Sequence, residues 1–150
     1  MRIAFASDHA AVDLKSALVE WARGNGHDVT DLGPETADRV DYPDYGYKLA
    51  AYIAAGDADF GVALCGSGIG ISIAVNRNPA CRCARVGDNL SARLARQHND
   101  ANVIAMGARL IGQDTAIDCL AAFIVTPFDG GRHEGRVAKL THPAAQEEHA

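Results

Sequence analysis

A cysteine stands at the start of a glycine-rich junction, in the segment LCGSGIGISIA of residues 64–74. An apolar run ends at Cys65, and Gly66, Gly68 and Gly70 leave the next stretch of backbone free of bulky side chains. Amides at the start of a helix lack partners within it and favour an anion. A thiolate in that field can act as a nucleophile or a general base. The junction therefore predicts an anion cradle beside a reactive sulfur. The plain alternative is a tight turn beside a buried, inert thiol.

The glycine spacing of this junction differs from that of the common nucleotide-binding loops. A dinucleotide fingerprint requires a third glycine where this chain has Ile71, and a P-loop requires a Gly-Lys-Ser/Thr ending that the segment lacks. A nucleotide- or flavin-binding module is therefore a weaker interpretation than a site for a small anion.

Further titratable and cationic side chains stand at other boundaries of the chain. Asp8 and His9 follow the first apolar run, and His98 lies in the segment RQHND before the last one. Arg132 and Arg136 are four residues apart, which places both guanidiniums on one helix face, where they suit a phosphate. The alternatives are ordinary: Asp8 as a helix cap, His98 as a dipole partner at a helix end, and arginines on a solvated face.

Short β-type runs alternate with longer helical patterns. We expect strands over residues 2–7, 28–33, 59–66, 81–87 and 102–108, and helices over residues 10–26, 45–56 (capped by Asp44), 67–78, 88–100, 112–128 and 130–146. This alternation predicts an α/β fold with a doubly wound five-stranded parallel sheet and helices on both faces. Two strand orders fit, 2-1-3-4-5 and 3-2-1-4-5. Ligands of such sheets bind beyond the carboxyl ends of the strands, where Asp8, Cys65 and Arg109 stand.

Length and composition fit one domain over residues 1–150, with about residues 141–150 as a tail. The net charge of −5 and the lack of a basic tract argue against nucleic-acid or membrane-surface partners. No run approaches the roughly 20 apolar residues that span a bilayer, and the first residues do not form a signal peptide. The four cysteines show neither C-x-x-C nor zinc-finger spacing, so we expect reduced thiols in the cytoplasm and no metal ion.

Five segments occur together, in order: DHAAVDLK, DYPDY, CGSGIGISIAVN, ARQHNDANVIAMGAR and GGRHEGRV. In this combination the chain resembles the type B ribose-5-phosphate isomerases, within a wider family that includes galactose- and allose-phosphate isomerases. The resemblance covers about residues 2–140. It implies a flavodoxin-like, Rossmann-type sheet, no cofactor, and a homodimer, or a dimer of dimers, whose active sites combine residues of two subunits.

The resemblance also implies a role for each matching position. Cys65 corresponds to the general base, with Ser67 beside it, and His98 to the acid that assists opening of the furanose ring. The cradle for the enediolate oxygen corresponds to the backbone of Gly66, Ser67, Gly68, Ile69 and Gly70. The remaining contacts to the sugar and its phosphate correspond to Asp8, His9, Tyr42, Asn99, Arg109, Arg132 and Arg136.

The activity implied is interconversion of ribose 5-phosphate and ribulose 5-phosphate through a cis-enediolate. Alternatives are isomerisation of allose 6-phosphate, galactose 6-phosphate or a tetrulose phosphate, and binding of a phosphosugar without turnover. The chain departs from the family at Ala11, where a glycine is usual, and in the segment ACRCAR of residues 80–85, where the strand is commonly more apolar. We expect neither departure to affect the implied chemistry.

Overall fold

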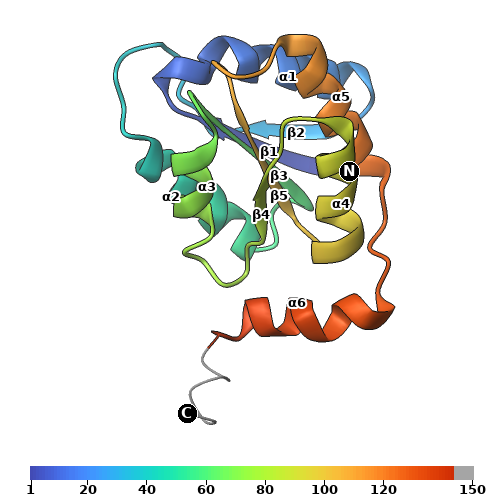
Figure 1. Ribbon diagram of the computed structural model, residues 1–150. Helices are drawn as coiled ribbons and strands as arrows, with labels where there is room; N and C mark the ends of the chain where they lie inside the picture. Colours follow the sequence, from blue (N-terminus) through green and yellow to red (C-terminus); the bar gives the residue numbers. More distant parts are fainter. Residues whose placement is uncertain (144–150) are drawn as a thin grey trace.

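A five-stranded parallel sheet forms the centre of the computed structural model, which describes residues 1–143 (Figure 1). The strands are β1 (Arg2–Ser7), β2 (Asp28–Asp31), β3 (Phe60–Cys65), β4 (Cys83–Arg85) and β5 (Val103–Gly107). The helices are α1 (Val12–Gly24), α2 (Tyr42–Ala54), α3 (Ile69–Val75), α4 (Asn89–Asn99), α5 (Gln113–Val125) and α6 (Glu134–Thr141), with short 3-10 turns η1 (His9–Ala11) and η2 (Gly131–His133). The predicted doubly wound, flavodoxin-like α/β fold is confirmed. Most of the expected tail, from residue 144 on, lies outside the described residues.

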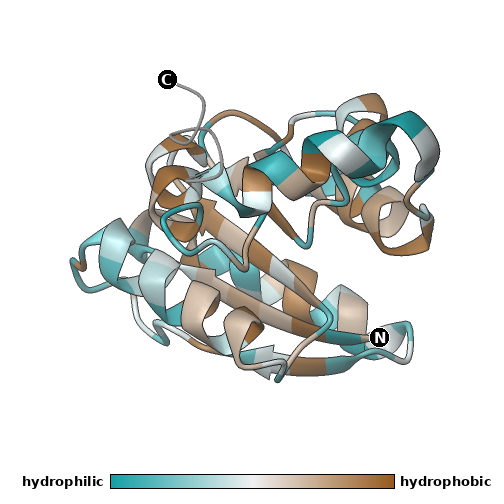
Figure 2. Ribbon diagram, turned by 90° about the horizontal axis from the view of Figure 1, so that it is seen from below, coloured by the Kyte–Doolittle hydropathy of each residue, from teal (hydrophilic) through white to brown (hydrophobic). Residues whose placement is uncertain are grey.

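The two faces of the sheet carry side chains of different size. Large residues such as Phe5 and Leu64 pack in one cluster with α1, α4 and α5, whereas Ala4, Ala6 and Ala63 pack in a second cluster with α2 and α3. Because successive residues of a strand point to opposite faces, each central strand contributes to both clusters. Figure 2 shows hydrophobic residues along the central strands. Within the described residues, no helix has the length and apolarity required to span a bilayer.

The strand order is β2-β1-β3-β5-β4, so neither predicted order is correct. The first three positions agree with 2-1-3-4-5, but the last two strands are exchanged. All five residues of β5 are buried, whereas β4 is three residues long and its Arg85 is exposed. An apolar strand is stabilised between two neighbours, and a short strand with a charge is suited to an edge.

Helix α2 begins earlier than the sequence predicts. Its cap is Asp41 rather than Asp44, and Pro43 lies in its first turn, where a missing N–H costs nothing. Tyr42, which precedes the expected helix, therefore stands on its first turn.

The carboxyl ends of three strands meet at one edge of the sheet. Ser7 pairs with Leu64, and Cys65 pairs with Gly107. The chain is tied across this edge just beyond the strands, where the Asp8 amide donates to the Leu64 carbonyl (3.0 Å) and the Arg109 amide donates to the Gly66 carbonyl (3.0 Å). Residues that are far apart in the sequence are thereby held side by side.

Candidate active site

A pocket lies at this carboxyl edge. It is lined by Asp8, Tyr42, Cys65, Gly66, Ser67, Gly70, Arg109 and Leu110. Seven of these eight residues are predicted site residues. Cys65 is only 4% exposed, yet it borders this pocket, so a residue that is shielded from bulk water still lies beside a space for a ligand.

The loop after β3 directs main-chain N–H groups at its own polar side chains. The Gly68 amide donates to Cys65 Sγ (3.1 Å), and the Ile69 amide donates to Ser67 Oγ (3.1 Å). A donor aimed at sulfur stabilises negative charge there. Within residues 1–143 no hydrogen bond uses the amides of Ser67 and Gly70, and both residues line the pocket. These two amides are available to an anionic oxygen.

Two of the glycines in the loop are required by its geometry. Gly68 has φ of +76°, and a Cβ there would lie 2.7 Å from the Met106 carbonyl carbon. A Cβ on Gly70 would lie 2.6 Å from the Tyr42 ring. The first glycine therefore lets the loop turn tightly over β5, and the second brings Tyr42 against the start of α3.

Asp8 and His9 are both anchored to the backbone. Asp8 Oδ1 accepts from the Ala10 amide (3.0 Å), so the alternative role of Asp8 as a cap is confirmed, although the residue also lines the Cys65 pocket. His9 Nδ1 lies 3.1 Å from the Val40 carbonyl oxygen and 3.2 Å from the Val40 amide nitrogen. Among the described residues, His9 Nε2 has no such partner. It is the ring nitrogen that remains for a ligand.

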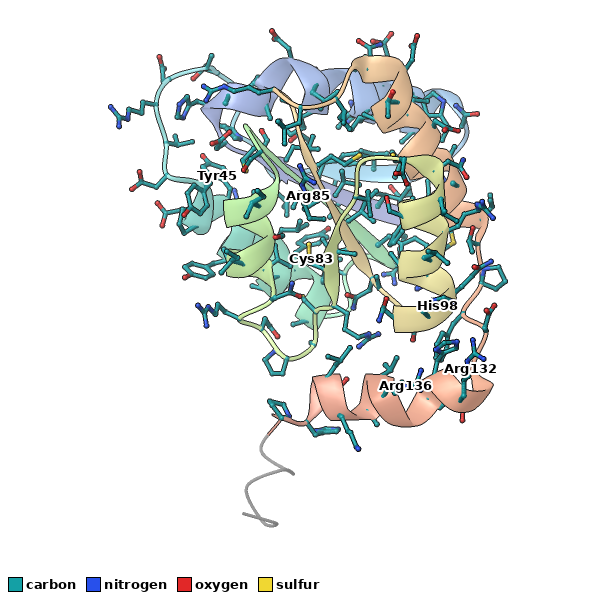
Figure 3. All side chains as sticks on the ribbon, in the orientation of Figure 1. Tyr45, Cys83, Arg85, His98, Arg132 and Arg136 are labelled. Atoms are coloured by element: carbon teal, nitrogen blue, oxygen red, sulfur yellow. The ribbon has the colours of Figure 1, made fainter. Side chains whose placement is uncertain are left out.

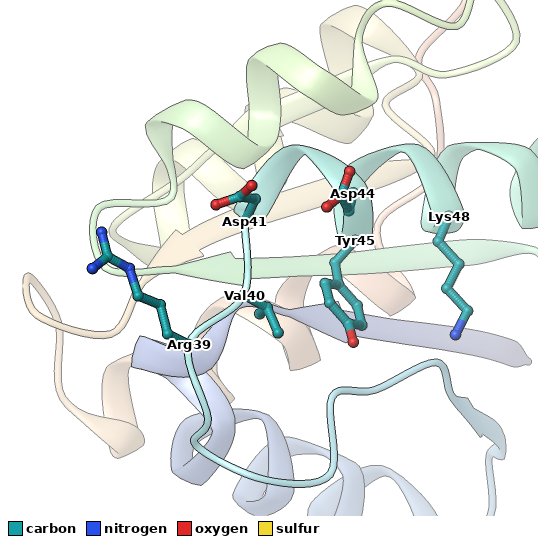
Figure 4. A pocket seen from close by; sticks show the side chains of 6 residues that line it. All are labelled: Arg39, Val40, Asp41, Asp44, Tyr45 and Lys48. Carbon is teal, nitrogen blue, oxygen red and sulfur yellow. The ribbon is translucent and has the colours of Figure 1, made fainter.

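A neighbouring hollow, shown in Figure 4, was not predicted. It is lined by Arg39, Val40, Asp41, Asp44, Tyr45 and Lys48, and it shares several of these residues with the hollow that Asp8 and His9 border. Lys48 is already engaged, since its Nζ donates to the Leu32 carbonyl (2.8 Å). Two carboxylates oppose two cations here, so this hollow has no net attraction for an anion.

The remaining predicted residues lie at the other end of the molecule. His98 and Asn99 end α4, which returns the chain to the amino edge of the sheet, and Arg132 and Arg136 lie in η2 and α6 (Figure 3). None of these four residues lines the Cys65 pocket. One chain thus carries two separate groups of candidate residues.

The end of α4 is held by a buried arginine. Arg96 donates from Nη1 to Asp100 Oδ1 (2.9 Å) and to the Ala101 carbonyl (2.7 Å), and its guanidinium lies 4.9 Å from the centre of the Phe60 ring. Asp100 ends the helix with φ of +45°. These contacts position His98 on the last turn of α4.

His133 stands beside Arg132 and belongs to the second group, although no sequence motif points to it. Its ring stacks on that of His98, with centroids 4.5 Å apart and planes inclined by 16°. His98, Asp129 and His133 bring ligand atoms within 4.8 Å of one another, a combination that can bind a divalent metal. Arg132 and Arg136 place positive charge at the same ring, however, and this field disfavours a cation and suits a phosphate.

The pKa of His133 is lowered from 6.5, first by burial and then by the charges of His98, Arg132 and Arg136. The unfolded chain therefore binds a proton at a higher pH than the folded chain does, so the stability that His133 contributes is present above about pH 6.5 and is lost as the pH falls. We expect the urea concentration at the unfolding midpoint to decrease as the pH is lowered from about 7.5 to about 5.5. The decrease should be smaller in His133→Gln. An equal fall in both proteins would contradict this assignment.

The fold and the pocket define a class: a doubly wound α/β protein with a pocket at the carboxyl ends of its central strands, where proteins of this fold bind their ligands. Comparison with known proteins then identifies the family. Residues 3–140 match the family described as Ribose/Galactose Isomerase, and the chain belongs to it.

Individual relatives support this membership. Ribose-5-phosphate isomerase B of Escherichia coli is 39% identical over 140 residues, 93% of this chain and 94% of the relative. D-erythrulose-4-phosphate isomerase of Pectobacterium atrosepticum is 38% identical over 150 residues, 99% of each chain. The structure of ribose-5-phosphate isomerase B from Clostridium thermocellum superimposes with a TM-score of 0.95 at 39% identity, covering 98% of this chain and 99% of the other. The chain is accordingly a sugar-phosphate isomerase, which interconverts an aldose and a ketose.

Proposed function

We propose that this enzyme interconverts ribose 5-phosphate and ribulose 5-phosphate, with the Cys65 thiolate as the base. The observation that carries the proposal is the position of Cys65, which borders the pocket and whose Sγ accepts a hydrogen bond from the Gly68 amide. The thiolate takes the proton from C2, and the C–H electrons form the double bond of the enediolate between C1 and C2. The C1 carbonyl electrons move to O1, and the O2 hydrogen then moves to O1. The Cys65 thiol, whose proton can exchange with solvent in the meantime, delivers a proton to C1, and the ketose carbonyl forms at C2.

The free amides of Ser67 and Gly70 serve this reaction as donors to the enediolate oxygen. They border the same pocket as the sulfur, and they belong to a backbone that Gly68 and Gly70 hold in place. A preorganised donor of this kind is worth about 3–4 kcal/mol of transition-state stabilisation. Arg109 adds a positive charge at the same pocket.

The second group of residues completes the site from another copy of the chain. We propose a homodimer in which His98 assists ring opening, Asn99 contacts the reacting end of the sugar, and Arg132 and Arg136 bind the phosphate. Its support is that the Cys65 pocket contains no residue of this group.

Apolar surface next to both groups supports the same assembly. Ile69 and Ile73 of α3 are 51% and 52% exposed, beside the Cys65 loop, and Leu140 of α6 is 57% exposed. Helix α6 buries none of its residues against the rest of the described chain. A second copy that covered these exposed apolar side chains would bring residues of both groups into one interface.

The free state of all four thiols supports a reducing compartment such as the cytoplasm as the place where the enzyme works.

A four-carbon substrate is the second candidate, because a relative that matches 99% of the chain is named for D-erythrulose 4-phosphate. A substrate panel distinguishes the two. We expect kcat/KM for ribose 5-phosphate to exceed that for tetrulose, allose and galactose phosphates by about tenfold or more, since one carbon changes the distance between phosphate and reacting end. A clear preference for a four- or six-carbon phosphate would overturn the choice of substrate and leave the reaction class intact.

A further inference from the structure

The peptide unit that joins Ser67 to Gly68 is hydrogen-bonded at both ends. Its N–H donates to Cys65 Sγ (3.1 Å). Its carbonyl oxygen accepts from Arg85 Nε (3.1 Å), which reaches the loop from the end of the edge strand β4 (Figure 3). One peptide therefore connects a guanidinium to the candidate base.

The surrounding backbone allows this peptide little freedom of translation. A Cβ on Gly107 would lie 2.6 Å from the Ser67 carbonyl carbon, so the loop rests directly on β5. A rotation of the peptide plane would break both of its hydrogen bonds. A rotated peptide would turn its carbonyl oxygen toward the sulfur and would disfavour negative charge there. The Arg85 hydrogen bond opposes this rotation because it holds the oxygen on the other side.

We propose that Arg85 is a positioning residue for the reaction, acting on Cys65 through the Ser67–Gly68 peptide. It keeps the N–H on the sulfur, and its charge polarises the peptide, which strengthens the N–H···S bond and stabilises the thiolate. The proposal rests on the proposed role of Cys65 as base. The other charged residues on the Cys65 pocket are Asp8, which opposes a thiolate, and Arg109, which favours one.

Arg85 has no comparable structural task in the described part of the chain. Its side chain is exposed, its bond to the Ser67 carbonyl is its single hydrogen bond there, and it forms no ion pair with described residues. Arg93 supplies a matched control: it is also exposed, and its Nε makes one hydrogen bond, to Asn89 Oδ1 (2.8 Å). Arg85→Met and Arg93→Met remove the same charge and the same kind of donor.

The test measures the sulfur directly, as the rate of Cys65 alkylation by iodoacetamide across pH, read by mass spectrometry. Cys81 and Cys119 are internal references, because burial raises the pKa of each to about 11. We expect Arg85→Met to move the alkylation midpoint of Cys65 upward by about one pH unit and to lower kcat about tenfold near neutral pH, with KM little changed. The loss in kcat should recover as the pH rises. Arg85→Lys keeps the charge, so its alkylation midpoint and its kcat should lie between those of the parent and those of Arg85→Met.

The outcomes separate this proposal from the proposed function. An alkylation profile of Arg85→Met that matches those of the parent and Arg93→Met would overturn the role of Arg85. A shifted profile with unchanged kcat would uphold the action of Arg85 on the sulfur and would contradict Cys65 as the base. Circular dichroism verifies folding, and if the methionine variant fails to fold, Arg85→Lys provides the same comparison.

Discussion

Cys65→Ala is expected to lower kcat for ribose 5-phosphate by about 10³–10⁴-fold, because it removes the group that carries the proton between C2 and C1. The loop amides and Arg109 remain, so the affinity for the sugar phosphate should change by less than about threefold. A ketose assay gives kcat, and calorimetry gives the affinity. Incorporation of solvent deuterium at the reacting carbons should be lost in parallel, since exchange requires the same base.

Two further variants isolate the ionisation of the sulfur from its packing. In Cys65→Ser the oxygen can still accept from the Gly68 amide, but a hydroxyl does not ionise near neutral pH, so this variant should be almost as inactive. Cys81→Ala removes a buried thiol that does not border the Cys65 pocket, and it should keep most of the activity. If Cys65→Ala retains most of the activity, another group is the base.

Mixing Cys65→Ala with His98→Ala should restore activity that neither variant has alone. In a dimer with shared sites, a mixed dimer has one site with both defects and one site with none. Random exchange of subunits makes half of the dimers mixed, and one of the two sites in each mixed dimer is intact. About a quarter of the parent activity is therefore expected from the mixture, whereas each variant alone should retain about 1% or less. Co-refolding at a one-to-one ratio, followed by the ketose assay, measures this.

A control mixture shows whether the restoration comes from shared sites. Cys65→Ala mixed with Cys65→Ser carries the defect at the same end of both chains, so no dimer has an intact site and no activity should return. If the mixture of Cys65→Ala and His98→Ala is as inactive as this control mixture, each chain builds its site alone. The composite arrangement would then be wrong.

The alternation of apolar runs and helical patterns in the sequence predicts most of the fold. The strands and the two-sided burial follow from local periodicity, because a strand that is apolar at every position must be covered on both faces. The order of the last two strands was predicted wrongly, although the sequence contained a signal. A strand with Arg85 near its end is poorly suited to the middle of a sheet, whereas VIAMG of β5 is well suited to it.

The positions of the site residues were predicted in part. Asp8, Cys65 and Arg109 follow strands, so their meeting at one edge was expected, and the pocket confirms that they meet. His98 precedes a strand instead. A residue at the end of a crossover helix lies at the amino edge of a parallel sheet, so the separation of His98 from Cys65 was also implied. The stacking of His133 on His98 had no local signal, because 35 positions separate the two residues in the sequence.

The amino-acid sequence by itself determined the strands, the chemical types at their ends and the glycines that permit a tight loop beside Cys65. These features depend on local stereochemistry and on side-chain polarity, which are properties of a few consecutive residues. Only the tertiary structure decided that β5 lies between β3 and β4 and that Arg85 reaches the Ser67 carbonyl. It also decided that His98, His133 and the paired arginines lie away from the Cys65 pocket. The order of the strands decides which residues meet. That order is set by competing contacts between residues that are distant along the chain, and local sequence patterns do not determine them.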